Sequence, residues 1–434
     1  MKRLLRRAAL VMVAVMRNTV VAFFLLVACN IVTGATPTVL KKYSDFDQPP
    51  HDYWKRTPND RFSKFKVALE AGTVKLDASS EQSFLLSLLR ALEIPPTSQM
   101  LVFSTTSLQL SLISPRNPRA IYFNEDVYIG YVPGGKIEVI STDPDLGPVF
   151  YIFDIPRQEG LVPRIERATR CMNCHAGEEM GWLPGILIKS VIPGTIGGSL
   201  ESFRQEITGH AVPLTLRFGG WHVTGAGNFT NHWGNIIGQS SPQGLVKYPI
   251  LPGRQFNFAR YPVATSDFLA HLLHEHQAGF VNRAVEATYK TRSFLDEGQG
   301  KLSLAHSTEL EKQARLFTRY LLFADEVSLP MGGVTGDAAL KADFLKGRRV
   351  TRAGISLKDF DLRTKIFLNR CSYMIYSSAF QGLPPMMKGL VYKRLGEALN
   401  TVIPDKEYAY LPAAEKMAIR QILRETMSDL PKGW

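Results

Sequence analysis

The chain has 434 residues, of which 45% are hydrophobic, so it is long and apolar enough to bury a sizeable core. Its formal net charge of +12 at pH 7 falls to +7 without the five basic residues before Cys29 (12 − 5), which is a modest excess. Because no cluster of Lys and Arg and no RNA-binding aromatic motif accompanies this charge, we expect no nucleic-acid partner. A mildly basic chain is compatible with an acidic partner protein or an anionic membrane surface.

Residues 1–35 have the pattern of a signal peptide or of a membrane or lipid anchor. Four Lys or Arg residues among the first seven precede an apolar stretch, which Met16-Arg17-Asn18 interrupts, so Met16 is an alternative start. Leu26-Val27-Ala28-Cys29 resembles a lipobox and predicts a lipidated Cys29. Cleavage after Ala35 and an uncleaved anchor over Ala8–Val32 remain alternatives. All three alternatives predict a periplasmic or cell-surface protein. A lipidated Cys29 or an uncleaved anchor also predicts membrane attachment through the N-terminus.

Residues 36–160 predict an N-terminal α+β region with a mostly antiparallel sheet. Thr36–Asp60 is rich in Pro and Asp and is predicted to be irregular, whereas Glu81–Leu92 has helical apolar spacing that Pro95-Pro96 ends. Six short β-like runs follow, separated by tight turn signals. They are Met100–Ser104, Leu108–Ile113, Ala120–Phe123, Val127–Val132, Lys136–Ser141 and Val149–Phe153.

Residues 161–260 contain a Cys motif and a Gly/Trp-rich stretch, and residues 261–434 are predicted to be helical. The segment before the motif, Pro163–Arg170, is charged and not strand-like. No linker marks two independently folding domains, so one intertwined unit is equally compatible with the sequence. The predicted helices are Ser266–Glu286, Ser307–Asp325, Leu357–Phe380, Met386–Asn400 and Ala413–Asp429.

The motif Cys171-Met172-Asn173-Cys174-His175 is a C-x-x-C-H run, which is typical of the attachment site of a c-type haem. Two thiols three positions apart on a helical turn can each form a thioether with a haem vinyl group. The imidazole of the next residue then lies under the iron as the proximal axial ligand. The sequence therefore predicts one haem c, held by Cys171, Cys174 and His175.

Other uses of the motif fit the sequence less well. A structural zinc site needs four ligands, and Cys371 is the only other cysteine outside the N-terminal segment. A thioredoxin-like dithiol would follow a strand and open a helix. We interpret Cys371, which lies in an apolar stretch, as a buried inert thiol.

The ligand on the other face of the iron is not given by the motif, and His276 is the first candidate. On a helical wheel that starts at Leu269, His276 and Arg283 lie on one apolar stripe, whereas His271 and His274 fall outside it and are predicted to face outward. This predicts His276 as distal ligand and Arg283 as the partner of a haem propionate. The alternative is a hydrogen-bonded core histidine with Arg283 paired to a protein carboxylate.

The Gly-rich stretch from Arg217 to Asn235 is the second candidate. His232 and His222 could each ligate the iron or line the pocket, and Trp221 and Trp233 could form its walls. The alternative is a Gly-rich β-hairpin with aromatic packing.

Two methionines are weaker candidates. Met180 is only five residues from His175, which is barely enough chain to pass around the macrocycle. Met331, in Leu329-Pro330-Met331-Gly332, is more simply a loop residue that shields the core from solvent.

Several stretches resemble an uncharacterised bacterial family of large secreted monohaem cytochrome-c-like proteins. The resemblance implies haem c and export over roughly residues 50–400 and implies no particular reaction. His222 departs from it, because another aromatic residue is expected there, whereas His232 and His276 lie in matching stretches. The matching stretches are 98–104, 118–124, the motif itself, 219–221, 232–235, 275–277 and 371–377.

The leading hypothesis is an exported c-type haem protein that transfers one electron at a time to a redox partner protein. One alternative is a peroxidase- or oxygenase-like haem enzyme with an open distal face. There His232 or His222 would act as acid or base and Arg283 or Arg217 would stabilise charge. Another is a haem-based redox or gas sensor.

Overall fold

The computed structural model describes residues 43–158, 160–203, 209–227 and 229–434. The predicted export segment, residues 1–35, lies outside the described residues. Ser44–Trp434 forms one compact unit. Within the described ranges, no helix is both long and apolar enough to cross a membrane.

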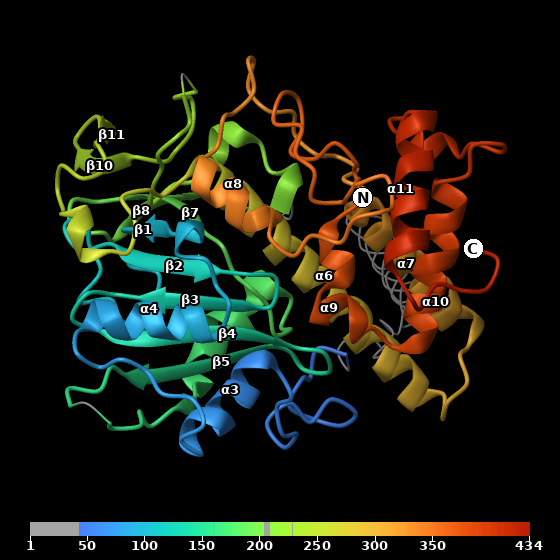
Figure 1. Cartoon of the computed structure of the whole chain (residues 1–434), viewed down its shortest axis with the longest axis horizontal. Helices are drawn as coiled ribbons and strands as arrows, with labels where there is room; N and C mark the ends of the chain where they lie inside the picture. The colour runs from blue at the N-terminus through green and yellow to red at the C-terminus, as the bar shows by residue number, and fades with distance from the viewer. Residues whose placement is uncertain (1–42, 159, 204–208, 228) are drawn as a thin grey trace, which may run out of the picture. The chain divides into compact units, whose positions relative to one another are not determined.

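A seven-stranded antiparallel sheet forms the N-terminal half of this unit, and helices form most of the C-terminal half, so the predicted α+β class is confirmed (Figure 1). The strand order is β6-β5-β4-β3-β2-β1-β9, and consecutive strands from β1 to β6 are neighbours. The strands are β1 (Met100–Val102), β2 (Arg119–Phe123), β3 (Val127–Tyr131), β4 (Lys136–Asp143), β5 (Gly147–Asp154), β6 (Glu166–Arg167) and β9 (Trp221–His222).

Two helices, α3 (Arg61–Glu70) and α4 (Glu81–Ala91), cover one face of the sheet, here called the α3/α4 face. Each helix begins at a side-chain cap, because Asp60 accepts hydrogen bonds from two backbone N–H groups of α3 and Ser80 accepts one from α4. The ring of Phe62 lies 4.9 Å from that of Tyr151 on β5. Alternate strand residues thus supply the main apolar core on this face.

The opposite face of the sheet, here called the α6 face, packs against the long helix α6 (Phe268–Glu297). The Tyr128 hydroxyl on β3 donates to the Gln277 side chain of α6 over 3.0 Å. Farther along α6, Val285 lies over Gly147 at the start of β5. On its other side α6 packs against α7, where Phe280 and Phe317 are 5.0 Å apart. Because α6 is enclosed from both sides, 22 of its 30 residues are buried.

Six further helices, including α7, and two hairpins complete the described fold. The helices are α5 (Met172–His175), α7 (Leu304–Leu321), α8 (Ala338–Leu345), α9 (Ser378–Gln381), α10 (Pro385–Ala398) and α11 (Ala413–Thr426). In Figure 1, α10 and α11 lie beside α7, away from the sheet. The hairpins are β7 (Ser190–Pro193) with β8 (Ser199–Phe203), and β10 (Ile236–Ser241) with β11 (Gly244–Pro249).

Two predicted elements are wrong, and both were predicted from apolar residues alone. Leu108–Ile113 forms turns instead of a strand, and the Gln109 side chain, not a backbone ladder, bonds the Lys136 backbone. Leu357–Phe380 is mostly irregular, with a 3-10 turn at Tyr373–Tyr376 followed by α9. There Asp359 and Ser372 accept hydrogen bonds from nearby backbone N–H groups, which compete with helix formation.

Candidate functional site

The C-x-x-C-H motif forms one continuous helical stretch at the edge of the sheet. The preceding segment, predicted not to be a strand, contains the two-residue strand β6, which pairs with β5 and brings the chain to this edge. A 3-10 turn over Thr169–Cys171 then runs directly into α5. Met172 and Ala176 are buried in the main core and anchor the turn, so the spacing of the two cysteines is fixed by packing.

The two thiols of the motif differ in exposure. Cys171 is half-buried, Cys174 is exposed, and both are free thiols. Burial, assisted by the negative charge of Glu138, raises the pKa of Cys171 to about 12. This thiol therefore keeps its proton at neutral pH. The third described cysteine, Cys371, is fully buried, as predicted for an inert thiol.

The imidazole of His175 is oriented by a single hydrogen bond. Nδ1 lies 2.9 Å from the carbonyl oxygen of Gly185. Because a carbonyl only accepts, Nδ1 carries the hydrogen and Nε2 keeps its lone pair. The ring also packs 4.6 Å from that of Phe150 on β5. Burial lowers the pKa of His175 to about 4, so the ring is neutral at pH 7.

The loop that holds His175 is itself fixed to α6. The side chain of Asn282 accepts from the backbone N–H of Ile186 over 2.8 Å and donates to its carbonyl over 3.0 Å. Met180 packs against Gly185, on the side of His175 that carries Nδ1. Metal-binding histidines commonly donate the second ring N–H to a backbone carbonyl in this way.

An ion pair lies near the motif on the α6 face of the sheet. Arg119 on β2 and Glu138 on β4 are 2.8 Å apart, above Gly130, which has no side chain. The buried Nε of Arg119 makes no hydrogen bond to any described residue. The positive charge of Arg119 lowers the pKa of His175, although less than burial does. This arginine thus carries an unsatisfied donor near the motif, and no sequence pattern marks it.

Trp221, predicted as a pocket wall, lies on the α6 face next to His274. Its indole N–H donates to the carbonyl of Lys189 over 3.2 Å, and its ring is 6.3 Å from that of His274. The prediction that His271 and His274 face outward is wrong, because both are buried. The wheel assumed one buried stripe, whereas α6 is buried on nearly all sides.

His276 belongs to a separate, fully buried polar cluster. Its Nδ1 is 2.8 Å from Nδ1 of His210, and its Nε2 is 2.7 Å from the hydroxyl of Ser372. Both ring nitrogens are therefore engaged, and the structure corresponds to the alternative of a hydrogen-bonded core histidine. Arg283 donates to the carbonyl of Gly279, and its guanidinium stacks over Tyr320 of α7 at 3.9 Å. The structure does not place His276 or Arg283 with the motif.

His232 also lies away from His175. Its ring packs 5.6 Å from that of Phe218 and 6.5 Å from that of Phe268, the first residue of α6. Asn282, which holds the His175 loop, is 14 residues farther along α6 (282 − 268), or roughly 21 Å of helix rise.

The remaining predicted residues lie elsewhere. Trp233 packs on Phe203, with the Lys247 ammonium 4.8 Å from its ring centroid. Arg217 forms a buried ion pair with Glu275. Met331 is fully exposed, so it shields nothing.

His222 is fully buried, and neither of its ring nitrogens has a hydrogen-bond partner among the described residues. Its ring lies between those of Phe103 and Phe256. Because a buried, unpaired polar group is costly, His222→Phe should raise the free energy of unfolding by about 1 kcal/mol. Urea denaturation checks this: the midpoint should rise with an unchanged slope. His222→Asn, which keeps a polar group there, should lower the midpoint, and a fall in both variants would contradict the argument.

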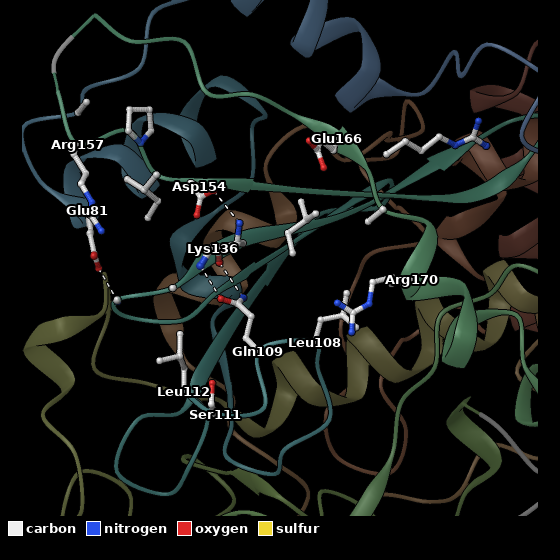
Figure 2. A pocket seen from close by; sticks show the side chains of 18 of the residues that line it. Glu81, Leu108, Gln109, Ser111, Leu112, Lys136, Asp154, Arg157, Glu166 and Arg170 are labelled. Carbon is white, nitrogen blue, oxygen red and sulfur yellow. Dashed lines mark hydrogen bonds and ion pairs between the residues drawn. The ribbon is translucent and has the colours of Figure 1, made fainter.

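A groove of about 1120 Å³ adjoins the motif, where β4 begins and β5 ends (Figure 2). Its walls include Leu108, Leu112 and the segment up to Arg170, the residue directly before Cys171. Lys136 and Asp154 pair across its floor at 2.8 Å. Arg157 and Arg170 are exposed and make no ion pair with a described residue. The groove therefore offers two guanidinium groups to an anion.

The structure thus brings Cys171, His175, Arg119 and Glu138 into one neighbourhood and places the predicted distal histidines outside it. Only long-range strand pairing joins β2 and β4 to the motif, and no local signal marks Arg119 or Glu138. In comparisons with known proteins, the chain matches no family model, no curated protein and no solved structure.

Proposed function

We propose that the protein binds one haem c through Cys171 and Cys174, with His175 as proximal axial ligand, and transfers single electrons through it. The observation that carries the proposal is the state of His175 on its helical turn: Nδ1 is committed to Gly185, and the neutral ring keeps a lone pair on Nε2. A simple dithiol gives no reason for an imidazole held in this way next to two thiols, and a structural zinc site would need a fourth ligand beside these three.

The thiols suit the attachment chemistry. Each S–H bond adds across one vinyl group, so that a C–S bond and a C–H bond form and no electron is gained or lost overall. The protonated thiol of Cys171 supplies both the sulfur and the hydrogen. The helical turn, anchored by Met172, holds the two sulfurs on neighbouring positions for the two vinyl groups.

Haem supplies an iron that exchanges one electron, and the surrounding residues bind and orient it. The Gly185 carbonyl holds the imidazole of His175, and Phe150 packs against the ring. The unsatisfied Nε of Arg119 suits a propionate, in place of the Arg283 that the sequence suggested. Partly buried Ile121, Ile140 and Ile152 offer an apolar surface on the same face of the sheet.

The same proposal implies that the protein is exported and that it exchanges electrons with a redox partner protein. Covalent attachment of haem c takes place outside the cytoplasm in bacteria, which agrees with a signal peptide or lipid anchor in residues 1–35 and with a periplasmic or cell-surface location. The exposure of Cys174 favours a haem edge that a redox partner protein can approach.

A second candidate function is a haem enzyme or sensor that leaves one iron position open. It is favoured by one observation: both ring nitrogens of His276 are hydrogen-bonded in another cluster, so His276 is not available to close that position. An iron without a strong second protein ligand can bind a small molecule.

The test of the proposal is expression of the full chain in a bacterial host that exports proteins and matures c-type cytochromes. After denaturing electrophoresis, haem-dependent peroxidase staining should coincide with the protein band, and the mass should increase by one haem. A folded, unstained protein with two reactive thiols, in a host that loads a control cytochrome c, would rule the proposal out.

The groove beside the motif predicts a charge effect on electron transfer. Arg157→Gln with Arg170→Gln should slow oxidation of the reduced protein by ferricyanide, an anion, by about threefold to tenfold at low salt. The difference should vanish at high ionic strength. Stopped-flow absorbance measures both rates, and an uncharged quinone is the control oxidant, for which the variants should match the wild type. An equal slowing with the quinone would show that the arginines do not act through charge.

A further inference from the structure

We propose that His274 faces the iron across an open distal position and donates a hydrogen bond to a small ligand bound there. The ligand class is an anion or a polar molecule of two or three heavy atoms, such as azide, cyanide or peroxide. This inference rests on the proposed attachment of haem at His175, and it assigns to His274 a role that the sequence did not suggest.

The sheet register places the two histidines on one surface. Phe150, Ile140, Tyr128 and Phe123 are paired in a single row across β5, β4, β3 and β2, and all four point to the α6 face. His175 lies over Phe150 at one end of this row, with ring centroids 4.6 Å apart.

His274 lies over the other end of the row. Its ring centroid is 5.4 Å from that of Tyr128 and 5.4 Å from that of Phe123. Two strand spacings separate Phe150 from Tyr128 and three separate it from Phe123. With strands about 4.8 Å apart, His175 and His274 are therefore roughly 10–14 Å apart across the sheet.

This separation excludes direct ligation by both rings. Metal–imidazole bonds are about 2 Å long, so two imidazoles bound to one iron have nitrogens only about 4 Å apart. The larger span therefore places His274 beyond bonding distance of the iron, where it would act as a hydrogen-bond donor to a bound ligand and not as an axial ligand.

The surroundings of His274 support a role toward a ligand. His274 is only 5% exposed, and its ring contacts those of Phe123, Tyr128 and Trp221 without a hydrogen bond to a described residue. Its ring nitrogens are not among the fully buried unpaired atoms, so they stay accessible to a small molecule. Burial lowers the pKa of His274 to about 3, so at neutral pH the ring is uncharged and carries one N–H.

Arg119 and its neighbours occupy the same surface between the two histidines. The positive charge of Arg119 lowers the pKa of both His175 and His274, which places this side chain within electrostatic reach of each. Ile121 and Ile140, one in each of two adjacent rows, remain partly exposed although they lie on a sheet face that α6 covers. A polar ligand there would meet the N–H donor of His274, whereas the charge of Arg119 is already compensated by Glu138.

The test measures azide binding to the purified ferric haem protein by absorbance titration. His274→Leu keeps the volume and removes the N–H, so the Kd for azide should rise about tenfold. His274→Gln keeps an N–H donor and should stay within about threefold of the wild type. His232→Ala is the control and should leave the Kd unchanged, because the His232 ring packs on Phe218 and Phe268 and not on the row of side chains between His175 and His274.

Each other outcome has a definite meaning. If haem is attached but His274→Leu binds azide as tightly as the wild type does, this inference fails and the proposed function stands. If the wild type does not bind azide and has a low-spin spectrum, whereas His274→Leu has a high-spin one, then His274 ligates the iron directly and the proposed open position is wrong. If no haem is attached, the proposed function fails and this inference fails with it.

Discussion

Replacing Cys171 and Cys174 together with Ala should abolish covalent haem while leaving the protein folded. Each thiol is the only atom that can form its thioether, so the double variant retains no covalent link. The fold should survive, because Met172 and Ala176 anchor the helical turn in the core and the exposed Cys174 contributes little to packing. We expect complete loss of in-gel haem staining with nearly unchanged circular dichroism.

The single variants should differ in stability rather than in staining. Each keeps one thioether and should still stain, with a shifted absorption band because one vinyl group remains. Cys171→Ala removes a half-buried side chain and should lower the free energy of unfolding by about 1 kcal/mol, whereas Cys174→Ala should lower it by less than about 0.5 kcal/mol.

Cys371→Ala is the matched control for these variants. Its thiol is fully buried and far in sequence from the motif, so this variant should stain like the wild type. Covalent haem in the double variant would contradict the assignment of the two thioethers. Loss of staining in Cys371→Ala alone would show that staining follows stability and not attachment chemistry.

The sequence predicted the parts of the fold that depend on local pattern. Turn signals and short β-like runs gave five strands of the antiparallel sheet, and apolar spacing gave α4, α6 and α7 approximately. The pattern failed at Leu108–Ile113 and Leu357–Phe380, where side chains bond nearby backbone and replace ladder or helix bonds. Hydrophobic spacing cannot detect that competition.

The residues of the candidate site also fall into those that local sequence predicts and those that only the fold brings together. The attachment chemistry is contained in five consecutive residues, so Cys171, Cys174 and His175 could be selected from sequence alone. Arg119, Phe150 and His274 reach the same surface only because strand pairing and the position of α6 bring them there. His276, and not His274, lies on the single apolar stripe that a helical wheel predicts, whereas α6 is buried on more than one face.

The second large effect expected is acid unfolding, driven by histidines that are buried in the neutral form. In the cluster of His210, His276 and Ser372, the carbonyl of Ala324 accepts from Nε2 of His210. His276 therefore donates from Nδ1 to His210 and accepts at Nε2 from the Ser372 hydroxyl. This chain of hydrogen bonds is complete only while both rings are uncharged.

Burial is the main cause that lowers the pKa of His276 to about 3, and the nearby charge of Arg283 lowers it further. Above pH 6.5 the ring is neutral in both the folded and the unfolded protein, so its contribution to stability is complete. As the pH falls below 6.5, the unfolded chain takes up a proton first, and this contribution is progressively lost. For one such histidine the loss is about 2 kcal/mol at pH 5.

Several other buried histidines act in the same direction, including His51 and His271, whose pKa values burial lowers to about 4 and about 3. We therefore expect the urea midpoint to be constant between pH 8 and pH 7 and to fall steeply between pH 6.5 and pH 5. His276→Ala should cost about 3 kcal/mol at pH 8, because it leaves a cavity and removes the partner of His210. The same variant should show a shallower fall with pH, since one proton-binding group is gone. A urea midpoint that stays level from pH 8 to pH 5 would mean that these rings accept protons in the folded state without penalty, which contradicts the hydrogen-bond assignment of the cluster.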